Sequence, residues 1–313
     1  MNLLLSCIST KHSMLKKHWE QAREQTHCPL TVLGSHHKPQ EDQGGLLCLL
    51  DETGYIQKSV ELPMPAGMTV SHDGVFVASL EAIHEVTPDL SLVQRDVLSL
   101  PAFNLLHSLS RTSRGYLVAS TGVDAIVEFT REGRELWSWW ATEHGFTQTP
   151  IGECRFLDTT IDHRGIKYGT LAQTTHVNSA VELSDGRILA SLFHQGMIIA
   201  IDRASGAWQP VLEGLDHPHA LRVLNGDYFT VADTGRGRAL LVHIEDGRGH
   251  VEVEVSATTN WLQDCFYDYR HDCWILVDGK NSRIILRTGT SSAKSQIQFD
   301  LNPEWRLYEV LPL

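Results

Sequence analysis

The sequence predicts an all-β fold, a six-bladed β-propeller, from two observations. The first is a series of short β-prone runs, each entered from a turn that contains Gly or Asp. These runs are GVFVAS (74–79), GYLVAS (115–120), GRILAS (186–191), DYFTVA (227–232) and DCWILV (272–277). A further apolar run follows each of them, so the chain repeats a unit of about 40 residues with room for four strands. Short strands at regular spacing with such turns are typical of antiparallel all-β proteins, and this unit is typical of a propeller blade.

The second observation concerns the two ends of the chain. NLLLSCIS (2–9) resembles the second strand of a blade, LLCLLD (46–51) a third and YIQKSVELP (55–63) a fourth, but no first strand precedes them. EWRLYEVLPL (304–313) is a first strand without a blade. Pairing of the C-terminal strand with the N-terminal blade completes six blades and leaves no open sheet edge. We therefore interpret residues 1–313 as one propeller domain, with a seven-bladed ring as the alternative.

Two insertions interrupt the repeat. In the first, residues 10–44, the spacing of Leu15, Trp19 and Ala22 predicts a helix near residues 11–27. We expect this helix to pack over one mouth of the ring or against its flank.

His36 and His37 follow that helix, and we expect them in a solvated loop. The second insertion, residues 143–175, is too long for a turn. Insertions of this length in a compact domain are often functional.

Composition limits the classes of partner. The chain has 38 acidic against 26 basic residues, a formal charge of −12 and no run of Lys or Arg, which argues against nucleic acid or an anionic membrane as the main partner. The N-terminal apolar run lacks the features of a signal peptide, and no segment approaches the roughly 18 apolar residues of a membrane span. Six scattered Cys residues without a CxxC pair predict reduced thiols in a cytoplasmic protein. Cys265 and Cys273 flank one predicted hairpin turn and could face each other.

Three histidines mark a candidate site. The innermost strands of a propeller line its central channel, and His107, His176 and His219 lie at the start of the predicted first strands of blades three, four and five. The corresponding positions in the other blades are Met68, Trp261 or Gln263, and the segment Trp305–Glu309. Three equivalent imidazoles in one channel favour a functional site over three structural histidines.

The segment TTHVNSAVELSDGRILASLFHQGMIIAIDRASG, preceded by GRELWSWWATEHGF and followed by HALRVLNGDYFTVADTGRGR, resembles the arylsulfate sulfotransferase family of six-bladed propellers. The resemblance covers about residues 105–245. It implies that His107, His176 and His219 are the catalytic channel histidines. It also implies that His219 is the nucleophile that takes a sulfuryl group from one phenol and passes it to another.

One position departs from the family pattern. The family has Arg before His-Gln, whereas this chain has Phe193 before His194 and Gln195. An Arg fork clamps a sulfuryl anion through two hydrogen bonds, and Phe cannot replace it.

Other residues are candidates for binding a small, possibly aromatic, substrate. They are Asn178, Phe193, His194, Gln195 and Arg236. Asn178 is two residues along the strand from His176 and so on the same face. Arg236 could supply the missing clamp, as could Arg111, Arg155 or Arg222. His194 and His217 are expected in supporting positions, and Glu309 in the closing strand is a candidate acid or base.

Two other functions stay open. Three neutral imidazoles from separate strands could bind a divalent metal ion (Zn, Fe or Cu) through His107, His176 and His219, in a lyase, hydrolase or oxidase. That arrangement resembles the peptidyl-hydroxyglycine amidating lyases, which are also six-bladed propellers. Alternatively, the propeller could be a non-enzymatic platform for a ligand or a protein, because a fold does not imply a function.

Overall fold

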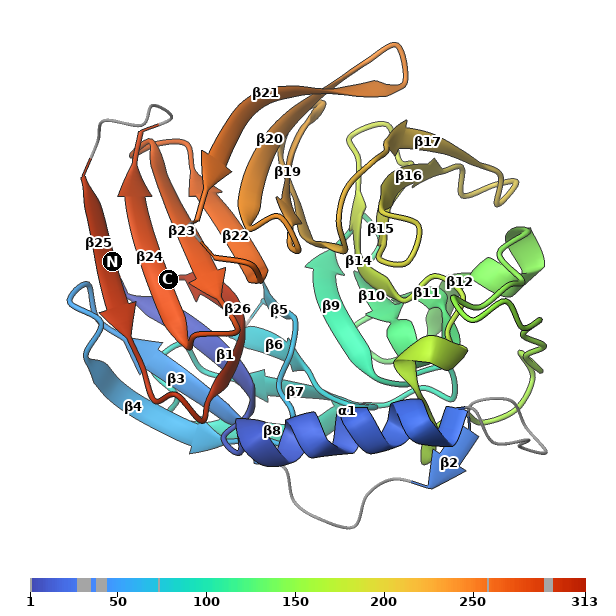
Figure 1. Ribbon diagram of the computed structural model, residues 1–313, viewed down its shortest axis with the longest axis horizontal. Helices are drawn as coiled ribbons and strands as arrows, with labels where there is room; N and C mark the ends of the chain where they lie inside the picture. Colours follow the sequence, from blue (N-terminus) through green and yellow to red (C-terminus); the bar gives the residue numbers. More distant parts are fainter. Residues whose placement is uncertain (1, 27–34, 38–43, 73, 258, 290–294) are drawn as a thin grey trace.

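Six antiparallel sheets stand around a common centre (Figure 1). The computed structural model describes residues 2–26, 35–37, 44–72, 74–257, 259–289 and 295–313. Within these residues there are six four-stranded sheets, and their innermost strands contact one another in ring order. The six-bladed propeller is confirmed, and the seven-bladed alternative is excluded.

The strands of each blade are given from the innermost to the outermost. Blade 1 contains β26 (Arg306–Pro312), β1 (Leu3–Ser9), β3 (Leu46–Leu50) and β4 (Ile56–Glu61). Blade 2 contains β5 (Met68–Val70), β6 (Val75–Ala78), β7 (Ile83–Val86) and β8 (Val93–Leu98). Blade 3 contains β9 (Leu106–Arg111), β10 (Tyr116–Ser120), β11 (Ala125–Phe129) and β12 (Glu135–Trp140). Blade 4 contains β14 (Val177–Glu182), β15 (Ile188–Leu192), β16 (Met197–Ile201) and β17 (Trp208–Leu212). Blade 5 contains β18 (Pro218–Asn225), β19 (Tyr228–Asp233), β20 (Arg238–Glu245) and β21 (Arg248–Ser256). Blade 6 contains β22 (Leu262–Asp268), β23 (Cys273–Asp278), β24 (Arg283–Thr288) and β25 (Gln296–Asp300).

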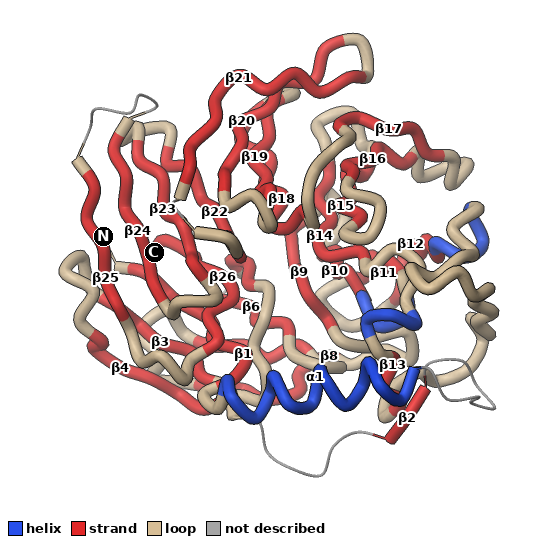
Figure 2. The backbone as a smooth tube through the Cα atoms, viewed as in Figure 1, coloured by secondary structure: helices blue, strands red, loops and turns tan. Residues whose placement is uncertain are grey.

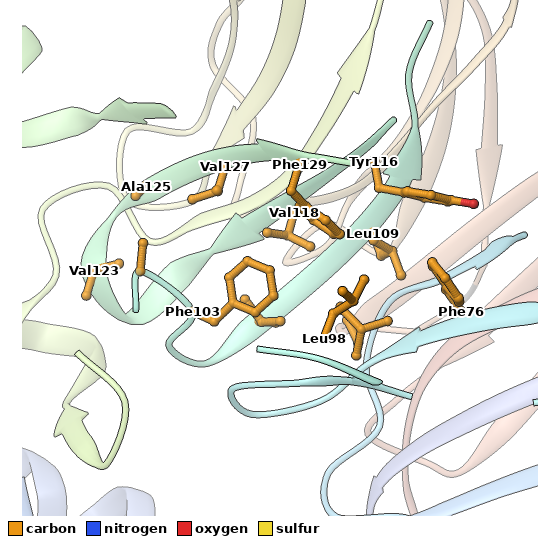
Figure 3. Packing of buried hydrophobic residues seen from close by; sticks show 14 of the residues in the cluster. Phe76, Leu98, Phe103, Leu109, Tyr116, Val118, Val123, Ala125, Val127 and Phe129 are labelled. Carbon is orange, nitrogen blue, oxygen red and sulfur yellow. The ribbon is translucent and has the colours of Figure 1, made fainter. Parts of the chain in front are cut away.

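The hydrophobic core is divided among the contacts between neighbouring blades. Successive side chains of a strand point to opposite faces, so Leu3 and Leu5 of β1 pack toward blade 6 while Leu4 packs toward blade 2. Both faces of a blade are therefore buried, which explains why the strands read as continuous apolar runs. Figure 3 shows the cluster between blades 2 and 3, where the rings of Phe76 and Tyr116 lie 4.8 Å apart.

The ring closes where the two ends of the chain meet. In β1, Leu5 pairs with Val310 of β26 on one side and with Cys48 of β3 on the other. The C-terminal strand thus becomes the innermost strand of the N-terminal blade, as predicted. This pairing gives β1 a hydrogen-bonded neighbour on both edges.

The two insertions meet each other. The first begins with α1 (His12–Thr26), which confirms the predicted helix and is the long blue segment in Figure 2. Beyond it, β2 (Ser35–His37) pairs with β13 (Ile166–Tyr168) of the second insertion. The prediction that His36 and His37 lie in a loop was wrong, because a strand remote in the sequence supplies their backbone partners.

The cysteines form no disulfide in the part of the chain that the structure describes. The expectation that Cys265 and Cys273 face each other was wrong, because β22 and β23 pair Cys265 with Leu276 and Cys273 with Asp268. Cys28 lies outside the described residues. Among the described helices, none has the length and apolar character needed to cross a membrane.

Candidate functional site

A cavity of about 280 Å³ lies at the centre of the propeller. Each blade contributes more than one residue to its lining, and we call a set of six of them, one from each inner strand, the ring. The ring consists of Tyr308, Met68, His107, Asn178, His219 and Gln263, from blades 1 to 6 in order. Two of the three histidines singled out in the sequence therefore line one cavity.

The strand register explains why the third histidine is different. In blades 3, 4 and 5 the first residue of the inner strand pairs with the last residue of the second strand. These pairs are Leu106 with Ser120, Val177 with Leu192, and Pro218 with Asp233. The residues that directly follow these first residues are His107, Asn178 and His219, so these three occupy equivalent positions in their blades. His176 precedes Asn178 by two positions and is not among the residues that line the cavity, so the predicted equivalence of the three histidines does not hold for His176.

A left-handed backbone residue precedes the inner strand in these three blades. Leu105, His176 and His217 have φ of 50°, 49° and 57°. In blades 3 and 5 the carbonyl of that residue accepts a hydrogen bond from the imidazole two positions later. Nδ1 of His107 lies 3.0 Å from the Leu105 oxygen, and Nδ1 of His219 lies 2.9 Å from the His217 oxygen. Left-handed non-glycine residues cost conformational energy and cluster at functional sites.

These hydrogen bonds determine the tautomer of His107 and His219. A carbonyl oxygen only accepts, so the proton lies on Nδ1 and Nε2 keeps its lone pair. Thr234 Oγ1 also lies 2.9 Å from Nδ1 of His219. Desolvation by burial lowers the pKa of His107 to about 4 and that of His219 to about 3. Both ring histidines are therefore neutral at pH 7, with a basic nitrogen on a side chain that lines the cavity.

The second insertion positions His176. Nδ1 of His176 donates to Oε1 of Gln173. The Gln173 amide nitrogen donates to the Tyr168 oxygen at 3.0 Å, which sets the orientation of that amide. Burial lowers the pKa of His176 well below its usual value. The insertion thus supplies a specific partner, as its length suggested.

Asp124 fixes the backbone that carries His176. Its carboxylate accepts hydrogen bonds from the backbone N–H groups of Thr174, Thr175 and His176 at 2.6, 3.0 and 2.7 Å. The buried guanidinium of Arg155 pairs with the same carboxylate. The position of His176 therefore depends on a buried ion pair between blade 3 and the second insertion.

Aromatic rings gather beside the ring at one mouth of the channel, and we call them the mouth cluster. It consists of His176, Phe193, His194, His217 and Trp261. Phe193 is its centre, with ring centroids 4.2 Å from His217, 4.6 Å from His176 and 6.4 Å from Trp261. The cluster contacts the ring, because His176 lies edge-on to His107 at 5.1 Å and Phe193 lies edge-on to His219 at 5.4 Å.

The five candidate substrate-binding residues lie in different parts of the site. Asn178 lines the cavity, and its amide nitrogen donates to the Pro218 oxygen at 3.2 Å. Nε2 of His194 lies 3.0 Å from the Thr170 oxygen, and the Gln195 amide donates to the Thr174 oxygen at 2.9 Å. Arg236 lies in the turn between β19 and β20, where it donates to the Gly214 oxygen at 2.6 Å and to Asp233 at 3.1 Å. Of the five candidates, Phe193 and His194 belong to the mouth cluster, and Gln195 and Arg236 bind backbone oxygens outside the ring.

A charged group lines the cavity beyond the ring. Arg222 forms a two-pronged ion pair with Asp264 and lies 3.5 Å from Oε1 of Glu309. The Met68 backbone N–H donates to the same Oε1 at 3.0 Å. Burial raises the pKa of Glu309 to about 8, although Arg222 opposes the shift. Burial therefore favours the neutral form of Glu309 in this cavity.

Sequence reasoning missed Asp264. Its signal is a polar pair, Gln263 and Asp264, inside the apolar strand segment WLQDCFY. Buried polar residues in a strand require partners, and Asp264 finds Arg222. Of the other arginines considered for the clamp, Arg111 lines the cavity and Arg155 is paired with Asp124.

The metal hypothesis requires three ligands in one place. Among the described residues, no three His, Cys, Asp or Glu side chains are grouped so that they could hold a metal ion. His176 belongs to the mouth cluster and not to the ring, although its ring centroid lies 5.1 Å from that of His107.

Comparisons with known proteins show the fold. No family model and no curated protein matches the sequence. A chain of the nidogen/laminin complex is 11% identical with a TM-score of 0.59, over 99% of this chain and 97% of that one. A putative 6-phosphogluconolactonase from Bacteroides uniformis is 14% identical with a TM-score of 0.53, over 95% and 81% of the chains. The periplasmic gluconolactonase of Pseudomonas aeruginosa is 12% identical with a TM-score of 0.50, over 88% and 82%. The fold therefore occurs both in enzymes and in a protein complex.

Proposed function

We propose that the chain is an enzyme that cleaves a bond to an oxygen leaving group in a small neutral substrate. Its central cavity is the active site. The imidazoles of His107 and His219 act as proton acceptors, and Glu309 acts as the proton donor. The observation that carries the proposal is that two histidines and one glutamate line the same cavity. Burial shifts them in opposite directions: it lowers the pKa values of the histidines to about 4 and 3 and raises that of Glu309 to about 8. In active sites, groups whose pKa values are shifted apart in this way commonly act as the general base and the general acid.

The same shifts explain how the proton moves. In the empty cavity the proton stays on Glu309, because burial opposes charge on all three groups. An imidazole takes a proton from a water molecule, whose oxygen bonds to the carbonyl carbon of the ester or lactone as the C–O bond to the leaving oxygen breaks. Negative charge that develops on the substrate raises the pKa of that imidazole and so favours the transfer. Glu309 protonates the departing oxygen. Asn178 and Tyr308 line the cavity, and their polar side chains are suited to hold hydroxyl or carbonyl groups.

The paired charges of the Arg222 group favour a neutral substrate beside Glu309, while Arg111 lines the same cavity without an ion pair to any described acidic side chain. Arg222 is already paired with Asp264, and Glu309 lies beside it, so no unpaired cation of that group is left to clamp an anion. Neutral lactones and esters fit the cavity's size and chemistry, and one solved propeller of this fold is named as a gluconolactonase.

Sulfuryl transfer with His219 as nucleophile is the second candidate. The Nε2 lone pair of His219 favours it, because a nucleophile must be unprotonated. Two observations count against it, namely Phe193 beside His219 and the paired state of Arg222.

The test measures turnover of a panel of neutral lactones and carboxylic esters, with p-nitrophenyl sulfate added for the second candidate. We expect kcat/KM for the best neutral substrate to fall by about 100-fold or more in His107→Asn, His219→Asn and Glu309→Gln, since each removes a proton-transfer group. His250→Asn and Glu252→Gln on the outer strand β21 are matched controls and should keep wild-type turnover.

Turnover that survives in all three cavity variants would contradict the proposal. Release of p-nitrophenol together with a sulfuryl adduct on His219, detected by intact mass, would support the second candidate instead. Binding of panel members without turnover would support the non-enzymatic platform.

A further inference from the structure

Arg306, the first residue of β26, is a buried cation without an anionic partner. Only 6% of its surface is exposed. Its guanidinium makes no hydrogen bond or salt bridge with any residue that the structure describes. Its neighbours are two indole rings, Trp19 of α1 at 5.8 Å and Trp261 of the mouth cluster at 5.5 Å. Proteins almost always pair a charge that is buried to this extent.

The two indoles offset only part of the free-energy cost of burying the Arg306 charge. A cation over an aromatic face gains electrostatic energy, but the ring edges cannot accept the five N–H donors of a guanidinium. Burial lowers the pKa of Arg306 to about 10, and the attraction of the buried Asp278 carboxylate is the largest effect that opposes this shift. The side chain is charged at pH 7, and no described residue accepts a hydrogen bond from its guanidinium.

From this we infer a second binding site, in which a small oxyanion sits on the Arg306 guanidinium between α1 and the mouth cluster. The guanidinium fork matches two oxygens of a carboxylate, sulfate or phosphate group. Trp19 and Trp261 form its apolar walls, and the site opens on the α1 side, where Trp19 is 37% exposed. This site is separate from the central cavity, and the inference does not depend on the proposed reaction.

An anion bound to Arg306 would change the pKa of His219 in the ring. Arg306 is one of the charges that lower the pKa of His219, and it also lowers the pKa of His12 on α1. An anion that neutralises Arg306 therefore raises both pKa values. Trp261 connects the two sites, because its ring lies 6.1 Å from His219 and its N–H donates to Gln263 of the ring at 2.9 Å.

The test compares thermal unfolding of the full chain in sodium acetate, sulfate or phosphate with sodium chloride at equal ionic strength. We expect at least one oxyanion to raise the midpoint by about 2 °C or more above chloride, because a ligand that binds only the folded state stabilises it. The three anions distinguish a carboxylate from a tetrahedral ligand. The net charge of −12 disfavours non-specific anion binding, so a response is informative.

Arg306→Met removes the charge but keeps much of the apolar stem. It should lose the oxyanion-specific rise, while Arg283→Met, which removes an arginine paired with Asp300 on blade 6, should keep it. Sulfate also stabilises proteins by exclusion from their surface, and an equal rise in Arg306→Met would assign the effect to that cause and overturn the site. No rise in the wild type would overturn it as well.

A second measurement does not depend on the stability of the variant. In the wild type, the oxyanion should shift the NMR titration of His219 to higher pH. Trp19→Ala changes only the helix wall of the site and should weaken this shift. A His219 titration that is the same with and without the oxyanion would contradict the inference.

Discussion

Blades 4 and 5 present the same backbone to the centre of the propeller but different chemistry. Each inner strand follows a left-handed residue, His176 in blade 4 and His217 in blade 5. Two positions later, blade 5 has His219 and blade 4 has Asn178, and both line the cavity. A histidine in this repeat thus belongs to the ring or to the mouth cluster according to a two-residue difference in position.

The anchoring of the two histidines differs as well. His219 is oriented by groups of its own blade, the His217 oxygen and Thr234. His176 is held from outside its blade, through Gln173 of the second insertion and Asp124 of blade 3. The two histidines therefore differ in what holds them as well as in their position in the blade, and three predictions test this difference.

The largest effect is expected for Asp124. Asp124→Ala should lower the free energy of unfolding by about 3–5 kcal/mol, because it leaves the buried Arg155 without its carboxylate. Asp233→Ala in blade 5 should cost less, about 1–3 kcal/mol, because its partners Arg236 and Arg238 are partly exposed. Urea unfolding of both variants measures the difference, and equal losses would contradict the distinction between the blades.

The second prediction concerns the stability of the fold at low pH. The pKa values of His107 and His219 are depressed in the folded state, so their neutral forms stabilise the fold above about pH 6.5 and this contribution is lost as the pH falls toward 4. Each histidine should account for about 3 kcal/mol of that loss. The pH dependence that Glu309 contributes to stability has the opposite sign. Its pKa is raised to about 8, so its contribution to the free energy of unfolding is present at low pH and lost as the pH rises through 8.

The measurement is the free energy of unfolding at pH 7 and pH 4. Between these values His219→Asn should lose about 3 kcal/mol less than the wild type. His250→Asn, on the exposed part of β21, should lose as much as the wild type. Equal losses in His219→Asn and the wild type would show that His219 is not held neutral by the fold.

The smallest effect is expected for His176 in turnover. His176 does not line the cavity. His176→Asn should therefore keep kcat/KM within about threefold of the wild type, against a loss of about 100-fold or more in His219→Asn. The two variants are compared on the same substrate of the panel. A loss in His176→Asn as large as that in His219→Asn would restore the hypothesis of three histidines acting together.

Much of the fold could be predicted from local patterns. Alternating faces that are both buried produce runs such as LLLSC and LLCLL, and turns between them mark the strands. The missing first strand at one end and the spare one at the other predicted the closure. The pairing of β2 with β13 could not be predicted, since it joins two short segments that carry no periodic signal and lie far apart in the sequence.

The candidate site was predictable only in part. His107 and His219 could be placed at the start of inner strands by repeat spacing. His176 was placed with them because the sequence does not show where in each blade the inner strand begins. That start depends on a left-handed residue and on hydrogen bonds to Asp124, which is remote in the sequence.

The sequence by itself determined a closed six-bladed propeller and the strands that face its centre, because both follow from the period of apolar residues and turns. Only the tertiary structure decided which side chains form the ring, which are neutral, and that Arg306 is buried without an anion. The physical reason is that desolvation and pairing depend on atoms of several blades and of α1. No local pattern in the chain records them.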